Sequence, residues 1–197
     1  MKRSKLIVLI TAFAFAVLLF SSCASVPQAD VDAATVAVQT AKTAGADLYV
    51  PQAFQAVTDS LKSANEQVEV QKAKWFPNYT KAKALLVVVN KMATDELVLI
   101  ETRKTELKNE TASLLVEVKG LIESNKALIA KAPRGKEGRA ALVAITSDIT
   151  VVETTVTEVE ALVANGDLIG SNDKIKAAKE KATAIKTELE TAISKTK

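Results

Sequence analysis

The residue with the most distinctive chemistry is Cys23, the only cysteine in a chain of 197 residues. It ends the sequence Phe20-Ser21-Ser22-Cys23, and an apolar run at residues 6–20 leads into it. That run is shorter than the roughly 20 residues that span a bilayer, but it has the length of a signal-peptide core. The basic residues that precede it are Lys2, Arg3 and Lys5. The sequence therefore predicts a secretory signal peptide at residues 1–22.

Residues 20–23 resemble the lipobox of bacterial lipoproteins, in which the cysteine becomes the first residue of the mature chain. Phe20 stands where leucine is commoner, which keeps that position apolar. The resemblance implies that residues 1–22 are removed, that the Cys23 thiol carries diacylglycerol and that its amino group carries an acyl chain such as palmitate. By analogy with lipoprotein sorting, Ala24 rather than aspartate implies the outer membrane, with the protein facing the periplasm. An ordinary secretory signal and an uncleaved anchor helix are the alternatives.

The anchor and the first helix are close in sequence. Residues 23–26 form the acylated cysteine and a short tether, and Pro27 can begin a helix. The three residues that separate Cys23 from Pro27 extend to about 10 Å at most. Ser25 and Gln28 have the spacing of a capping box. We therefore expect the first helix to start close to the lipid headgroups.

The remaining residue types argue against an enzyme. The chain contains no histidine, so its serine and threonine hydroxyls lack the commonest general base, and a His/Cys zinc site cannot form. Acidic residues could hold cations or transfer protons, but basic residues alternate with them, which predicts a solvated face. They are Asp95, Glu96, Glu101, Glu106, Glu110 and Glu117. We expect no catalytic residue, no metal, and no cofactor beyond the lipid on Cys23.

A second candidate site is the basic loop around two glycines near residue 135. Arg134, Lys136 and Arg139 lie there, where a new helix is expected to begin. Backbone N–H groups at a helix N-terminus attract anions, so a lipid or glycan phosphate could bind. A solvated turn is the alternative interpretation.

The charge balance gives no reason to expect nucleic-acid binding. The full chain has a formal net charge of +3, but three of its basic residues belong to the predicted signal peptide. Without them the Lys and Arg residues fall from 26 to 23, which equals the 23 Asp and Glu residues. The mature chain is therefore about neutral, and a basic surface for nucleic acid is not predicted.

The chain is expected to be organised around one long helix between Pro77 and Pro133. Apolar residues recur there at every seventh position: Tyr79, Leu86, Ala93, Ile100, Leu107, Leu114, Leu121 and Leu128. A seven-residue apolar repeat keeps one face of a helix against a partner. Residues 78–132 therefore predict a helix of about 54 residues, roughly 80 Å long. Only Leu107 is apolar between Glu101 and Thr111, which suggests a solvated middle.

Shorter helices are expected on both sides of the long one. Their apolar residues alternate in steps of three and four, and glycine or proline separates them. We predict one from Pro27 to about Gly45, one from Pro51 to about Lys74, one after the basic loop, and one capped by Ser171 or Asn172. Trp75-Phe76-Pro77 is expected to form a corner that closes a bundle.

The predicted fold is all-α, an elongated, coiled-coil-like antiparallel bundle in which two three-helix lobes share the long helix. The N-terminal lobe covers residues 27–105 and the C-terminal lobe covers residues 106–197. The long helix is as long as two of its neighbours, so one pair can cover each half.

Part of the N-terminal lobe resembles an alanine-rich domain family of unknown function that occurs in bacterial envelope lipoproteins. The resemblance rests on Ala44-Gly45-Ala46, Tyr49, Pro51 and Phe54, and covers roughly residues 29–92. Val50 and Val57 stand where alanine is usual in that family. Some members carry a peptidoglycan-binding domain of the outer-membrane protein A type, which does not follow here. The resemblance implies a helical envelope module without a reaction.

The function expected from these observations is that of a membrane-anchored, non-enzymatic lipoprotein with a structural or partner-binding role in the cell envelope. Its partners would be the membrane, through Cys23, and an envelope protein or a second copy of the chain. The alternative is a carrier that holds an apolar or lipid ligand between its helices.

Overall fold

The computed structural model of the chain describes residues 25–133 and 135–195, and the regular structure within them is entirely helical. The predicted all-α helical bundle is therefore confirmed. The helices are α2 (Gln28–Thr43), α3 (Ala46–Tyr49), α4 (Pro51–Lys72), α5 (Thr80–Lys131), α6 (Lys136–Ala164) and α7 (Leu168–Ser194). The chain divides into two compact units, with the boundary between Glu101 and Thr102 inside α5. We call them the first and second unit; the two-lobe arrangement stays a prediction.

The long helix is present as α5, with 52 residues. The Asn78 side chain accepts a hydrogen bond from the Thr80 N–H at 3.0 Å, as a residue capping the start of a helix does. The apolar ladder is buried as far as Leu107, whereas its later leucines are half-buried. An α-helix drifts by about 20° per heptad relative to a seven-residue repeat, so its buried face moves around the helix. Beyond Leu107 the buried positions of α5 are accordingly Thr111, Val118 and Ile122, with Asn125.

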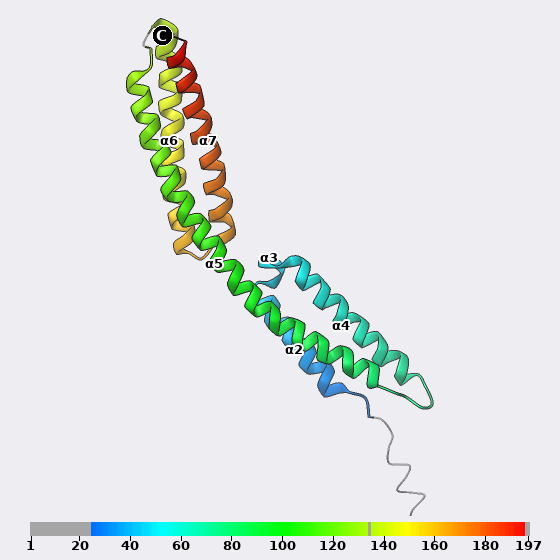
Figure 1. Ribbon diagram of the computed structural model, residues 1–197. Helices are drawn as coiled ribbons and strands as arrows, with labels where there is room; N and C mark the ends of the chain where they lie inside the picture. Colours follow the sequence, from blue (N-terminus) through cyan, green and yellow to red (C-terminus); the bar gives the residue numbers. More distant parts are fainter. Residues whose placement is uncertain (1–24, 134, 196–197) are drawn as a thin grey trace, which may run out of the picture. The chain divides into compact units, whose positions relative to one another are not determined.

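The first unit has a core of small side chains. α2 and α4 both pack along the first part of α5 (Figure 1). Its fully buried alanines are Ala34, Ala41, Ala46, Ala64, Ala82 and Ala93. Valines and Leu86 fill the spaces between them. Alanine allows helix backbones to approach closely, but it removes little apolar surface from water.

Gly45 makes the corner between α2 and α3. Its φ is 98°, in the left-handed region, and the predicted helix stop at this glycine is confirmed. An added Cβ would lie 3.0 Å from Cδ2 of Tyr49, so the tyrosine ring also covers the glycine. The sequence did not predict the one-turn helix α3 that follows. Ala46 in α3 is completely buried against Ala41 and Ile100.

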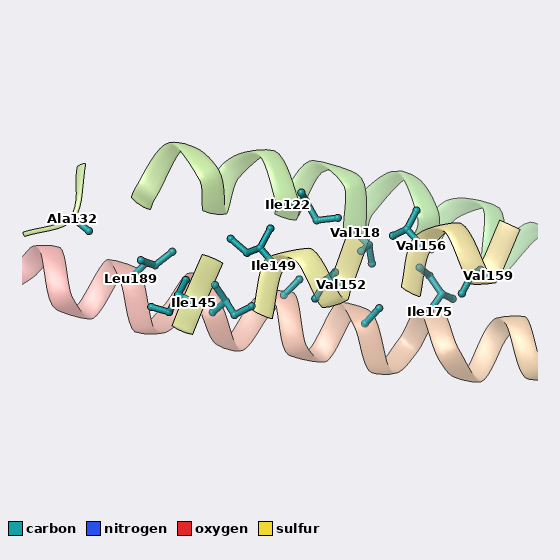
Figure 2. Packing of buried hydrophobic residues seen from close by; sticks show 13 residues of the cluster. Val118, Ile122, Ala132, Ile145, Ile149, Val152, Val156, Val159, Ile175 and Leu189 are labelled. Atoms are coloured by element: carbon teal, nitrogen blue, oxygen red, sulfur yellow. The ribbon is translucent and has the colours of Figure 1, made fainter. Parts of the chain in front are cut away.

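The second unit has a core of branched side chains. Figure 2 shows Val118 and Ile122 of α5, Ile149 and Val152 of α6, and Ile175 of α7 directed toward one another. Within the described residues, Gly138–Ala164 of α6 is the one segment long and apolar enough to cross a membrane by length and composition. The buried residues of this segment belong to the core of the second unit.

The threonines of α6, a residue type with strand propensity, form hydrogen bonds within the helix. Each of five threonine hydroxyls donates a hydrogen bond to the carbonyl oxygen four residues earlier, at 2.7–3.3 Å. These bonds satisfy the threonine hydroxyls within the helix, and the buried apolar face of α6 holds it in the core of the second unit. The residues are Thr146, Thr150, Thr154, Thr155 and Thr157.

Two predicted helix caps are wrong. α7 begins at Leu168 rather than after Ser171, because the Asp167 side chain accepts a hydrogen bond from the Gly170 N–H at 2.9 Å and caps the helix earlier. The capping box at the start of α2 does not form: Pro27 occupies the cap position, and the Gln28 amide donates to Asp32 instead.

Candidate functional site

The predicted lipidation site, Cys23, lies outside the described residues, as does the predicted signal peptide. The description begins at Ser25, and α2 starts three residues later at Gln28. The Val31 N–H donates to the Pro27 carbonyl oxygen at 3.0 Å, and Pro27 itself is buried. The first helix therefore begins within five residues of the thiol. At full extension those five residues span about 17 Å.

The loop between α4 and α5 lies next to this start. We call residues 73–79 the aromatic loop. Ser25, Phe76 and Lys83 line the same open hollow of about 630 Å³, so the loop and the beginning of α2 lie at one end of the first unit (Figure 1). Trp75 is 90% exposed and Phe76 is 85% exposed. The prediction that these side chains close the bundle is wrong, because Tyr79 and Val68 fill that end of the core instead.

The basic loop is described only in part. Arg134 lies outside the described residues, and the side chain of Lys136 also lies outside them, although its backbone opens α6. Arg139 is exposed and lines an open hollow of about 510 Å³ with Ile129 and Leu142, which are apolar. An added Cβ on Gly138 would lie 2.5 Å from the Pro133 carbonyl oxygen, so the turn requires a glycine there. The anion site stays a prediction.

The carboxylates of α5 do not all lie on a solvated face. Glu96 is 2% exposed, and neither of its carboxylate oxygens has a hydrogen-bond partner. Burial raises the pKa of the Glu96 carboxyl above its ordinary value of 4.5. The prediction of solvation was wrong for this residue because it lies three residues after Ala93 and four before Ile100, on the buried face. That spacing was the signal that could have identified it.

Glu110 has the opposite environment. The Lys176 ammonium lies 2.8 Å from its Oε1, and the Asn172 amide donates to its Oε2 at 3.1 Å. The hydrogen bond from Lys176 is the main reason that the pKa of Glu110 is lowered. Glu117 likewise forms an ion pair with Lys179 at 2.9 Å. These carboxylates join α5 to α7, and the sequence pattern did not reveal this role.

The sequence also did not predict that Asn125, Ser171 and Asn172 are buried in the second unit. Asn172 and Thr111 are both almost completely buried, and the asparagine amide donates to the threonine hydroxyl at 3.2 Å. Asn125 donates to the Ala182 carbonyl oxygen at 2.8 Å, and Ser171 to that of Leu168 at 3.0 Å. The heptad pattern follows apolar residues, so it does not show whether a given polar residue is buried or exposed.

Comparisons with protein-family models, with curated proteins and with solved structures find no match. The resemblance of residues 29–92 to an envelope lipoprotein family therefore stays a prediction. Among the residues described, no group of three Asp, Glu, His or Cys side chains is placed to hold a metal ion.

Proposed function

We propose that this chain is a bacterial lipoprotein, anchored by diacylglycerol and an N-acyl chain on Cys23, that serves as a non-enzymatic helical module of the cell envelope. The observation that carries the proposal is the order of residues 2–23: basic residues, an apolar run of signal-peptide length, two serines and the only cysteine. Ala24 favours the outer membrane and the periplasmic side.

The start of α2 supports an anchor that holds the protein close to the bilayer. The helix begins at Gln28, so little flexible chain follows the acylated cysteine. Several acyl chains hold a protein firmly, because each buried methylene contributes about 0.8 kcal/mol. The first unit would then sit beside the headgroups, and a partner in the periplasm would be met by the helices rather than by a flexible arm.

A partner-binding role is supported by apolar side chains that the described helices leave exposed. Val87 is 68% exposed, Val98 67% and Val116 74%, all on α5. We propose that such positions contact an envelope protein or a second copy of the chain. The two-lobe arrangement along α5 belongs to the same proposal, since it would present both units to partners.

The anchor is tested with the full chain expressed with its own leader in a bacterium with two membranes. Intact mass should show a chain that begins at Cys23 and carries diacylglycerol plus one acyl chain, and the protein should sediment with outer membranes. Cys23→Ser should abolish the lipid mass and release the protein from membranes. Ser25→Ala, two residues further on, is the matched control and should behave as the parent. If Cys23→Ser still sediments after a high-salt wash and keeps residues 1–22, the uncleaved anchor helix is correct.

The partner role is tested by crosslinking the tagged protein in cells and purifying it. Recovery of one envelope protein, or of a crosslinked dimer of the chain, supports the proposal. The protein can also be purified in detergent, which removes loosely attached lipid. If it then retains one equivalent of extractable lipid and no protein partner is found, the carrier is favoured instead.

A further inference from the structure

The aromatic loop displays two large apolar side chains to solvent. Trp75 and Phe76 are the most exposed large hydrophobic residues among those described, at 90% and 85%. Tryptophan and phenylalanine are buried in most proteins, because each covers a large apolar area. Their joint exposure at one loop therefore indicates a surface that is covered in the working state.

The loop is held in this conformation by its neighbours. The Asn78 N–H donates to the Gln71 side-chain oxygen at 3.0 Å, which ties the loop back to α4. Tyr79, the third aromatic residue of the loop, is 4% exposed and packs with Val68 and Ala82. The two sides of the loop are thus fixed to the first unit, and Trp75 and Phe76 remain outside.

The position of the loop indicates what covers it. Phe76 shares its hollow with Ser25. Ser25 is two residues from Cys23, a separation of about 7 Å at full extension. A cysteine that carries acyl chains would therefore bring a lipid surface to this end of the first unit.

The charges near the loop fit an anionic surface. Residues 73–83 contain Lys74, Lys81 and Lys83, all exposed, and no acidic residue. Asp30, in the first turn of α2, reduces the positive charge of this end, and Glu69, in the last turn of α4, is paired with Lys72 at 2.6 Å; both lie outside the loop. Lysines beside exposed aromatic residues are typical of protein surfaces that contact anionic lipids.

We propose that the aromatic loop inserts into the headgroup region of an anionic phospholipid membrane, beside the anchor. Trp75 and Phe76 enter the interface, and Lys74, Lys81 and Lys83 lie at the level of the lipid phosphates. This inference rests on the proposed acylation of Cys23. Together, the anchor and the loop make two contacts with the membrane, which restrict how the first unit can tilt and rotate.

Trp75 is the only tryptophan of the chain, so its fluorescence reports the loop directly. The full acylated protein is reconstituted into vesicles that contain phosphatidylglycerol. The emission should shift to shorter wavelength, iodide should lose more than half of its quenching, and lipids brominated near the headgroup should quench Trp75. In neutral phosphatidylcholine vesicles the shift should be smaller.

A matched control places the tryptophan at the far end of the same unit. Leu48 in α3 is 65% exposed, and the 22 residues of α4 separate it from the loop by about 33 Å. In the double variant Trp75→Phe with Leu48→Trp, iodide should quench freely and brominated lipids should have no effect. The triple variant Lys74→Gln, Lys81→Gln and Lys83→Gln should reduce the shift in anionic vesicles to that in neutral ones.

The outcomes separate this inference from the proposed anchor. Intact mass reports acylation independently: a chain without the lipid mass refutes the anchor. An acylated, vesicle-bound chain whose Trp75 stays accessible to iodide and insensitive to brominated lipid refutes the loop contact alone. A shift that occurs in isolated cell envelopes but not in protein-free vesicles would assign the loop to a protein partner and overturn the lipid contact.

Discussion

Glu96 in the first unit and Asn172 in the second are both buried polar residues, but their surroundings differ. In the first unit the Glu96 carboxyl is buried without a hydrogen-bond partner. In the second unit the buried Asn172 amide contacts both Thr111 and Glu110, and these contacts join α5 to α7. An unpartnered buried polar group costs stability, whereas a partnered one helps to select one register of helix packing. The same helix, α5, therefore carries the unpartnered Glu96 carboxyl in the first unit and the partnered Thr111 hydroxyl in the second, where the Oδ1 of Asn125 is also buried without a partner.

The hydrophobic cores of the two units also differ, in the size of their side chains. The first unit packs mainly alanine and valine, whereas the second unit packs isoleucine, valine and leucine. Ion pairs also join the helices of the second unit: Lys119–Glu160, Lys126–Glu153, Lys174–Glu158, Lys176–Glu110, Lys179–Glu117 and Lys181–Asp148. In the first unit Lys72–Glu69 and Lys91–Asp95 each lie within one helix. We expect the first unit to open at a lower free energy, as hydrogen exchange would measure.

The largest effect is expected where a proline interrupts α5 close to the boundary between the units. Thr105 is exposed within the helix, and Thr105→Pro should cost about 3 kcal/mol or more locally. Because each unit has its own buried cluster, amides in both cores should keep their protection from hydrogen exchange, while amides near residue 105 lose theirs. Thr105→Ala is the control. Complete loss of protection in both cores would show that the two units are not separable.

Removing the partnered amide should destabilise the second unit. Asn172→Ala leaves Thr111 without its donor and should cost about 1–3 kcal/mol. Hydrogen exchange should become faster in α6 and α7 and stay unchanged in α2 and α4. Asp173→Ala, at the neighbouring exposed position, is the control and should have little effect. Equal effects of the two variants would contradict the role of the buried contact.

Removing the unpartnered Glu96 carboxyl should raise stability rather than lower it. Glu96→Leu should stabilise the first unit by about 1–3 kcal/mol at neutral pH, because a buried group without a partner is replaced by an apolar one. The raised pKa means that the folded state binds the proton more tightly than the unfolded state does. The contribution of Glu96 to stability is therefore highest at low pH and falls as pH rises above about 4.5, toward the folded-state pKa.

Denaturation followed over pH checks this sign. As pH rises above about 4.5 toward the folded-state pKa of Glu96, the parent should lose stability relative to Glu96→Gln, which has a similar shape but cannot titrate. A parallel pH dependence of the parent and Glu96→Gln would mean that the carboxyl finds a partner in solution.

Substitutions at two glycines should change the free energy of unfolding by smaller amounts, in opposite directions. Gly45→Ala should cost about 1–2 kcal/mol, because its φ of 98° is unfavourable for a residue with a Cβ. Gly120 lies exposed in α5, and an added Cβ would meet no atom within 4 Å beyond its chain neighbours and the backbone of its own helix, so Gly120→Ala should gain about 0.5–1 kcal/mol. Thermal denaturation followed by circular dichroism measures both. A neutral Gly45→Ala would argue against the left-handed corner.

The smallest effect concerns the ion pairs. Each exposed pair contributes about 0–1 kcal/mol, so replacing Lys176, Lys179 and Lys181 by glutamine should destabilise the second unit only modestly at low salt. At about 1 M salt the difference should vanish, because screening then acts within roughly 3 Å. Lys91→Gln in the first unit is the control. A difference that persists in high salt would mean that the lysine stems matter through packing.

The sequence predicted α5 and the other long helices because their apolar spacing is dictated by helix geometry. It predicted the corner at Gly45 for the same kind of reason, since few residues other than glycine tolerate a positive φ. It did not predict that Glu96 is buried or that Trp75 and Phe76 are exposed. At these positions the residue type indicates one environment, and the position along the chain indicates the opposite one. The contacts of Asn172 depend on residues about 60 positions away, and nothing local encodes them.

The threonines of α6 have a consequence for recognition. Their hydroxyl protons are already donated to carbonyl oxygens of the same helix. What the outer side of α6 offers to an approaching molecule is therefore a row of methyl groups and oxygen lone pairs, with Val143 and Val151 exposed among them. Phosphates and carboxylates need donors and find few there, whereas amides, ammonium groups and hydrocarbon can be accommodated.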